Sequence, residues 1–177
     1  MDLTLHRVRL EDGPHLVDVG IDGGRIAVIQ EDELAPGARA VQGRGALLSP
    51  AFIDPHFHLE NALLHQVQNQ SGTLREAIKL YAGIKRDMSQ DNIVARATEV
   101  LRMAAAHGTL WLRNHVDIDQ VAQLRLLDAI CVVRDRFAGV IDIQIIAFPQ
   151  LGLARNPEAV ELMWRAMERG ATVVGGM

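Results

Sequence analysis

Two histidines, His56 and His58, stand one residue apart in the segment SPAFIDPHFHLE, at the end of an apolar run. On a β-strand, side chains two positions apart point to the same side, so both imidazoles would project together while Phe57 faces the opposite layer. Two neutral imidazoles on one face suit a divalent metal ion at about 2.0–2.2 Å from each nitrogen. The alternative is an ordinary histidine pair, because a bare His-x-His also arises by chance.

A second pair of polar residues, His115 and Asp117, occurs in RNHVDID, near the end of another apolar run. These side chains also share one face of a strand. They could bind a metal, support metal ligands or contact a substrate, or form a simple His–Asp pair at a loop. We favour the supporting or substrate-contacting role.

Two further polar residues follow predicted strands. Gln150, in AFPQLG, could read the donor–acceptor edge of a ring with its amide, or be an ordinary solvated loop residue. Glu60 comes just after His58 and could hold a ligand or cap the next segment. The remaining histidines are predicted to lie at the surface or at helix ends: His6, His15, His65 and His107.

The chain from Met1 to about Gly45 has the rhythm of strands and turns. LTLHRVRL, LVDVGID and RIAVIQ read as strands, and Asp22-Gly23-Gly24-Arg25 is a hairpin turn signal because glycine tolerates positive φ. The following segment, APGARAVQGRG, is predicted to be a loop.

From Ala46 onward, strands alternate with helices. The expected strands are ALLSPAFIDPHFHL, TLWLRNHVDI, VIDIQIIAF and ATVVGG. The expected helices start at the capping box of Thr73, at Gln90, at Asp119 and at Asn156-Pro157, and the last three end near His107, Phe137 and Gly170.

Apolar residues mark the faces of these helices that should be buried. Leu74, Ala77, Ile78 and Tyr81 fall on one face of the first helix. Core packing is predicted for Cys131 and for the stripe of Met163, Trp164 and Met167.

Alternating strands and helices imply parallel βαβ units with right-handed crossovers. A complete βα barrel needs eight such units and typically about 250 residues, so residues 46–177 would supply about half of one. The alternative is a complete small doubly wound sheet. We favour the half-barrel, because the sequence ends inside a predicted strand.

Composition excludes several classes of protein. The 177 residues are 49% hydrophobic and 23% charged, which is typical of a globular protein with a sizeable core. The net charge of −4 argues against nucleic acid or an anionic membrane as partner. Cys131 is the only cysteine, which predicts a reducing compartment. No apolar run approaches the ~18 residues that a membrane helix needs, and the N-terminus is too polar for a secretory signal, so we expect a cytoplasmic protein.

Five motifs occur in the order PAFIDPHFHLEN, NQSGTL, LRNHVDID, IDIQIIAFPQLGL and GATVVGGM. Together they resemble the cytosine deaminase branch of the amidohydrolase superfamily, which also contains N-isopropylammelide amidohydrolase-like enzymes. The resemblance implies a small β-sandwich built from both chain ends and a distorted (β/α)8 TIM barrel that holds one Zn²⁺ or Fe²⁺. We therefore expect residues 1–48 to be the N-terminal part of the β-sandwich and residues 49–177 to be the first half of the barrel.

The resemblance also implies roles for matched residues. His56 and His58 match the metal-binding His-x-His, Gln150 matches a glutamine that hydrogen-bonds the pyrimidine ring, and Leu74 matches an apolar wall of the pocket. The family's other histidine ligand, its proton-shuttling glutamate and histidine, and its metal-binding aspartate lie on later strands. No catalytic residue is therefore assigned in this chain.

Three positions depart from the family pattern. His115 and Asp117 match a Thr-His-Val-Asp motif in which Asn114 replaces the threonine. Glu60 and Asn61 stand where the cytosine enzymes tend to have Asp-Thr, so the motifs do not fix the substrate.

The resemblance implies a metal-dependent hydrolase that deaminates an amino-substituted, cytosine-like N-heterocycle, with metal-activated water as nucleophile. The alternatives are a truncated non-catalytic fragment and an amidohydrolase that acts on a cyclic amide or an N-alkylamino triazine. We expect the chain by itself to be inactive. The expected partners are a small heterocyclic substrate and either further copies of the chain or a missing C-terminal half, but neither nucleic acid nor membrane.

Overall fold

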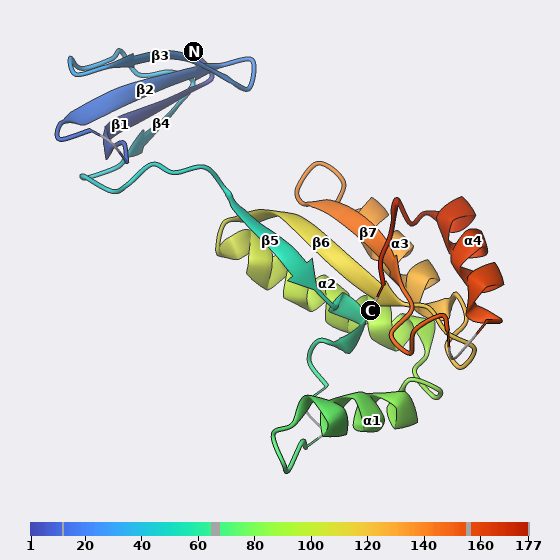
Figure 1. The fold of residues 1–177 in the computed structure, drawn as a ribbon. Coiled ribbons are helices and arrows are strands. Elements are labelled where there is room, and N and C mark those ends of the chain that lie inside the picture. The colour runs from blue at the N-terminus through green and yellow to red at the C-terminus, as the bar shows by residue number, and fades with distance from the viewer. Residues whose placement is uncertain (12, 65–67, 155–156, 177) are drawn as a thin grey trace. The chain divides into compact units, whose positions relative to one another are not determined.

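The computed structural model describes residues 1–11, 13–64, 68–154 and 157–176. The chain divides into two compact units, Met1–Pro50 and Ala51–Met177 (Figure 1). The boundary expected from the sequence, between residues 48 and 49, lies two residues before this division.

The first unit is a four-stranded sheet with the order β3-β2-β1-β4. Its strands are β1 (Leu3–Arg9), β2 (Leu16–Asp22), β3 (Arg25–Gln30) and β4 (Arg39–Gln42). Strands β2 and β3 join through the predicted hairpin turn, where Gly23 and Gly24 have φ of 55° and 74°. The prediction of a loop after β3 was wrong in part, because β4 pairs in parallel with β1 from Leu3↔Arg39 to His6↔Gln42.

A buried polar pair stabilises this sheet. The prediction that His6 lies at the surface was wrong: its side chain is buried, and its Nδ1 lies 2.6 Å from Asp18 Oδ2. Asp18 also accepts hydrogen bonds from the backbone amides of Arg7 (2.8 Å) and Leu34 (3.0 Å). Burial opposes ionisation of Asp18, but these hydrogen bonds outweigh it and hold the pKa of the carboxyl below its ordinary value.

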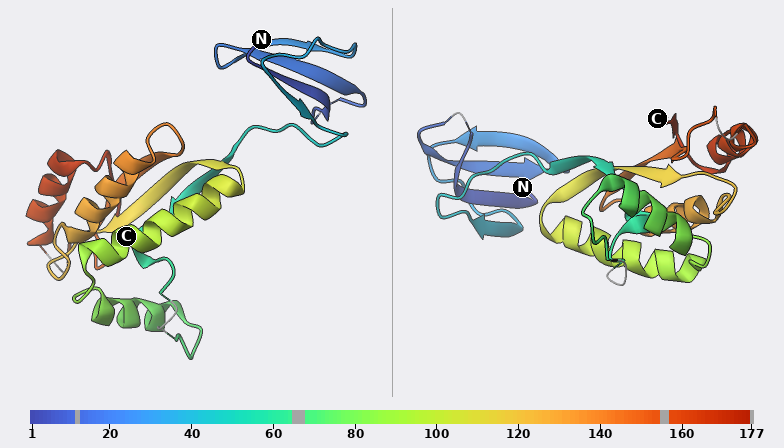
Figure 2. Two further views of the ribbon diagram at one scale, coloured as in Figure 1. Left: turned by 180° about the vertical axis from the view of Figure 1, so that it is seen from behind. Right: turned by 60° about the horizontal axis from the view of Figure 1, so that its bottom comes forward.

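The second unit is a parallel sheet with the order β5-β6-β7-β8, as predicted from the alternation of strands and helices. Its strands are β5 (Phe52–Phe57), β6 (Thr109–Asp117), β7 (Asp142–Phe148) and β8 (Val173–Val174). Helices α2 (Gln90–Ala106), α3 (Arg125–Arg136) and α4 (Ala159–Arg169) pack on one side of the sheet (Figure 2). The hydrophobic core lies in this interface, where Ile93 of α2 and Ile130 of α3 meet Leu112, Val116 and Ile145 of the strands.

Two elements lie past the C-terminal end of β5: the 3₁₀ turn η1 (Leu59–Asn61) and helix α1 (Leu74–Ile84) (Figure 1). Thr73 caps α1, and its hydroxyl accepts a hydrogen bond from the Glu76 amide at 3.3 Å, which confirms the predicted helix start. These two elements therefore stand at the end of the parallel sheet where ligand sites commonly form.

The starts of α3 and α4 were predicted at Asp119 and at Asn156. The prediction that Asp119 caps α3 was wrong: Asp119 accepts hydrogen bonds from the amides of Val121 and Ala122, both at 2.9 Å, and α3 begins only at Arg125. The predicted start of the last helix at Asn156 lies outside the described residues; α4 begins at Ala159 and ends at Arg169, and Gly170 terminates it as expected.

The predicted core stripe of α4 is correct only in part. Met163 is buried and Met167 packs against the core, but the indole of Trp164 is 69% exposed. Cys131 is half-buried against the same core, as predicted. Across the ranges that the structure describes, no helix is both long and apolar enough to cross a bilayer.

Candidate metal centre and substrate pocket

Strands β5 and β6 bring three imidazoles together. His56 is in β5, His58 follows its last residue, and His115 is in the neighbouring strand β6. The ring centroids of His56 and His115 are 4.0 Å apart, those of His56 and His58 5.2 Å, and those of His58 and His115 5.8 Å. Phe57 packs against the core on the other side of the strand, as the period of two requires.

An aromatic ring from β7 borders this histidine cluster, which comprises His56, His58 and His115. The centroid of Phe148 lies 6.0 Å from that of His58 and 5.8 Å from that of His115, in edge-on contacts. The cluster therefore has one apolar wall, and the histidines with this wall come from three neighbouring parallel strands, β5, β6 and β7.

Burial and neighbouring charges set the protonation of the cluster. Burial lowers the pKa of His115, and the adjacent His56 and His58 lower it further, so this ring is held neutral. Burial alone would also lower the pKa of His58, but the hydrogen bond and the charge of Glu60 outweigh it and raise the pKa. Neutral imidazole is the form that binds a metal ion.

The cluster fits a divalent metal in its donor types. The His115 Nδ1 is buried and has no hydrogen-bond partner among the described residues, as expected of a nitrogen whose partner is a bound ligand. His56 and His115 are stacked at an interplanar angle of 24°. Within the described ranges no three His, Cys, Asp or Glu side chains are arranged to hold a metal ion.

Glu60 is fully buried behind His58. Its Oε1 lies 3.4 Å from His58 Nδ1, and its Oε2 accepts a hydrogen bond from Asn114 Nδ2 at 3.3 Å. Asn114 Oδ1 in turn accepts a hydrogen bond from the Leu59 amide at 2.7 Å. Glu60 is thus placed to orient the His58 ring through Nδ1.

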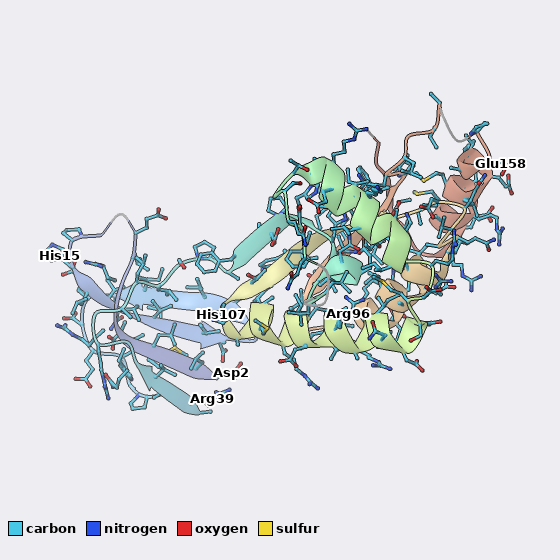
Figure 3. All side chains as sticks on the ribbon, turned by 90° about the horizontal axis from the view of Figure 1, so that it is seen from below. Asp2, His15, Arg39, Arg96, His107 and Glu158 are labelled. Atoms are coloured by element: carbon cyan, nitrogen blue, oxygen red, sulfur yellow. The ribbon has the colours of Figure 1, made fainter. Side chains whose placement is uncertain are left out.

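Arg96 holds the same segment from α2 (Figure 3). Its guanidinium donates hydrogen bonds to the carbonyls of Glu60 (3.0 Å) and Ala62. The turn that carries Glu60 and Asn61 is therefore fixed on both sides.

A buried lysine, which the sequence analysis missed, neutralises Asp117. Lys85 Nζ donates hydrogen bonds to Asp117 Oδ2 (2.6 Å) and to Asp119 Oδ2, and all three residues are 1% exposed. Burial alone would lower the pKa of Lys85, but the two carboxylates outweigh it and raise the pKa, so the ammonium is retained. The sequence did offer a signal: Lys85 lies four residues after Tyr81, on the apolar face of α1.

A cavity of about 310 Å³ opens beside the histidine cluster. It brings together three residues that the sequence analysis singled out: His58, Leu74 and Gln150. Its other polar lining comes from Asn61, Asn69 and Tyr81, and its apolar lining comes mainly from α1: Leu64, Leu74, Ala77, Ile78, Leu80 and Ile84.

The remaining histidines with described positions lie elsewhere. Figure 3 shows His15 in the first unit and His107 at the end of α2, and both are exposed, as predicted. His65 lies outside the described residues.

The chain resembles known proteins in both sequence and structure. No protein-family model matches the chain. N-isopropylammelide isopropyl amidohydrolase from Pseudomonas sp. (strain ADP) is 26% identical over 99% of this chain and 45% of its own length. The crystal structure of 5-methylcytosine deaminase from Klebsiella pneumoniae, liganded with 5-fluorocytosine, superposes with a TM-score of 0.88 at 34% identity, over 98% of this chain and 43% of that one.

A third relative has a similar fold. N-isopropylammelide isopropylaminohydrolase from Burkholderia multivorans has a TM-score of 0.82 at 30% identity, over 98% of this chain and 44% of that one. The chain thus spans less than half the length of these relatives.

The fold and the motifs match the N-terminal portion of enzymes of the amidohydrolase superfamily, with a small β-sheet unit followed by a parallel sheet and its helices. Within that superfamily, the resemblance to the cytosine deaminase branch predicted from five sequence motifs is confirmed.

Proposed function

We propose that this chain supplies the N-terminal half of a metal-dependent amidohydrolase that hydrolytically deaminates an amino-substituted, cytosine-like N-heterocycle. The observation that supports it is the convergence of the histidine cluster with a cavity lined by His58, Leu74 and Gln150. Three strands and helix α1 contribute to this one place, at the C-terminal end of the parallel sheet.

His56 and His58 would hold the metal, with His115 as a supporting or third ring beside them. A bound Zn²⁺ or Fe²⁺ would supply Lewis acidity and lower the pKa of a coordinated water toward about 7. Glu60 would fix the orientation of His58. Asp117 would support the histidine cluster from a buried position, in which its carboxylate accepts a hydrogen bond from the Lys85 ammonium.

Gln150 and Leu74 would bind the substrate. The backbone amide of Gln150 donates a hydrogen bond to the Phe148 carbonyl at 3.1 Å, which places the residue directly after β7 at the cavity. Its side-chain amide can donate to and accept from a ring edge. Leu74, although 76% exposed, would cover one ring face at the cavity wall.

The proposal also covers the groups that this chain does not supply. We propose that the missing proton-transfer groups and further metal ligands come from later strands of a full (β/α)8 barrel, supplied by a C-terminal half or by assembly of copies. We also propose a cytoplasmic location, from the single cysteine.

The second candidate is hydrolysis of a cyclic amide or an N-alkylamino triazine at the same site. The similarity to N-isopropylammelide hydrolases supports it. A non-catalytic fragment is the third candidate.

A chimera separates these candidates. The chain is joined to the C-terminal portion of the Klebsiella 5-methylcytosine deaminase, and ammonia and alkylamine release are assayed from cytosine, isocytosine and N-alkylamino triazines with Zn²⁺ or Fe²⁺. Metal-dependent ammonia release that His58→Ala abolishes and His107→Ala preserves is the expected result. Release of alkylamine alone would favour the second candidate. A folded, metal-loaded chimera without turnover would overturn the proposal.

A further inference from the structure

Two residues that line the cavity, Asn61 and Tyr81, each carry a buried polar atom, Oδ1 and the hydroxyl, that has no hydrogen-bond partner among the described residues. Buried polar side-chain atoms are nearly always hydrogen-bonded, because an unmade bond leaves the cost of desolvation uncompensated. Both atoms belong to residues that line the same 310 Å³ cavity. A ligand in that cavity is the partner that would satisfy them.

The backbone that carries Asn61 and the ring of Tyr81 each have a supporting contact. Arg96 fixes the backbone on either side of Asn61 through the carbonyls of Glu60 and Ala62. The Lys85 ammonium lies 5.5 Å from the centroid of the Tyr81 ring and is itself held by two carboxylates. Such preorganisation is typical of binding groups, because little ordering remains when the ligand arrives.

The two groups have complementary chemistry. Asn61 Oδ1 only accepts, so it requires an N–H or O–H donor. Tyr81 can donate its proton, and burial together with the nearby carboxylates raises its pKa and keeps that proton in place. A ring edge that carries an N–H group and a carbonyl or ring nitrogen would satisfy both.

The rest of the cavity limits the size of the ligand. A volume of about 310 Å³ is at the lower end of the roughly 300–1,000 Å³ of small-molecule sites. Side chains of α1, among them Ile78 and Ile84, supply an apolar wall. A single ring with at most a small apolar substituent suits this space.

We propose that Asn61 and Tyr81 determine specificity by hydrogen bonding to the donor–acceptor edge of a monocyclic amino-N-heterocycle that enters this cavity. This inference rests on the proposed function and extends it to residues that neither the motifs nor the relatives assign. Asn61 accepts from the amine or ring N–H of the ligand, and Tyr81 donates to its carbonyl oxygen or ring nitrogen.

The test uses the whole chain and the fact that Tyr81 is its only tyrosine. Tyrosine labelled with ¹³C in the ring reports on the cavity through one set of NMR signals, and saturation-transfer NMR gives ligand affinities for all variants. The probes are cytosine, 5-methylcytosine and, as a ring without polar groups, toluene. The variants are Asn61→Leu, Tyr81→Phe and the control Gln90→Leu, because Gln90 is an exposed amide side chain on α2 and is not among the residues that line the cavity.

We expect cytosine and 5-methylcytosine to shift the Tyr81 signals. Asn61→Leu and Tyr81→Phe should each weaken their binding about tenfold, and Gln90→Leu should change it less than twofold. Toluene binding that is equal to or tighter than cytosine binding, and that Asn61→Leu strengthens, would show an apolar cavity and overturn the inference. So would cytosine binding that neither variant changes, or an absence of cytosine binding.

The proposed function has a separate readout in the same samples. The response of the His56 and His58 signals to Zn²⁺ tests the metal site without any heterocycle. If that response is present while the Asn61 and Tyr81 variants bind cytosine normally, only the further inference fails.

Discussion

Replacement of Lys85 by methionine should destabilise the second unit more than any surface substitution. Among the residues that the structure describes, Lys85 is the ammonium that pairs with two buried carboxylates, Asp117 and Asp119, so Lys85→Met leaves their charges uncompensated. Asp119 would keep its hydrogen bonds from the amides of Val121 and Ala122. Asp117 would keep much less hydrogen bonding, because its Oδ1 has no hydrogen-bond partner among the described residues.

The expected magnitude follows from this difference. Breaking a buried ion pair by removing one partner typically costs about 3–5 kcal/mol, against a total stability of about 5–15 kcal/mol for a domain. We expect Lys85→Met to lower the free energy of unfolding by about 3–5 kcal/mol. Adding Asp117→Asn should recover at least ~1 kcal/mol, because it removes the charge that is left alone.

Urea unfolding at neutral pH measures these values. Tryptophan fluorescence reports on the second unit alone, since both tryptophans, Trp111 and Trp164, lie within it. Lys79→Met is the matched control, because Lys79 is an exposed lysine on the same helix and its loss should change stability by less than ~0.5 kcal/mol. The reasoning is refuted if Lys85→Met unfolds at the same urea concentration as Lys79→Met, or if Asp117→Asn worsens the loss.

Three further predictions concern other parts of the chain. Because the pKa of Asp18 is lowered in the folded state, its contribution to stability should be present above its ordinary value of 3.8 and be lost as the pH falls through the folded value. Asp18→Asn should therefore lower the free energy of unfolding by about 1–3 kcal/mol at neutral pH and reduce the loss of stability in acid. Amide exchange at Arg7 measures both effects, and an equal loss of stability in acid in the two proteins would refute the prediction. In the chimera, Gln150→Ala should lower kcat/KM by about one to two powers of ten, and unchanged kinetics across the substrate panel would reject its role. The chain alone, at an intact mass of 19.5 kDa, should release no ammonia above buffer, and metal-dependent turnover would contradict this.

Local patterns predicted most of the elements correctly. The alternation in β2, the glycine turn before β3 and the Thr73 cap of α1 each depend on residues close in sequence. Strand β4 was missed because its pairing with β1 joins segments more than thirty residues apart, from Leu3 to Arg39, and its four residues show no clear period.

The candidate site was predictable to a similar extent. The period of two placed His56 and His58 together, and the motifs pointed to Gln150 and Leu74, which line the cavity with His58. Long-range polar pairing was not predictable: the burial of His6 depends on Asp18 in the next strand, and that of Lys85 on carboxylates about thirty residues away. A single sequence gives the residue types for such pairs but not which of them meet.

Titration of the chain with Zn²⁺, followed by ¹⁵N NMR of its seven imidazoles, tests the central claim of a metal centre most directly. We expect the signals of His56 and His58 to shift first and together, His115 to respond with them, and the exposed His15 and His107 not to respond. His58→Ala should abolish the shift of His56, and His107→Ala should leave it unchanged. A response that is spread equally over His15 and His107, or a shift of His56 that survives His58→Ala, would show that His56 and His58 do not form a metal site.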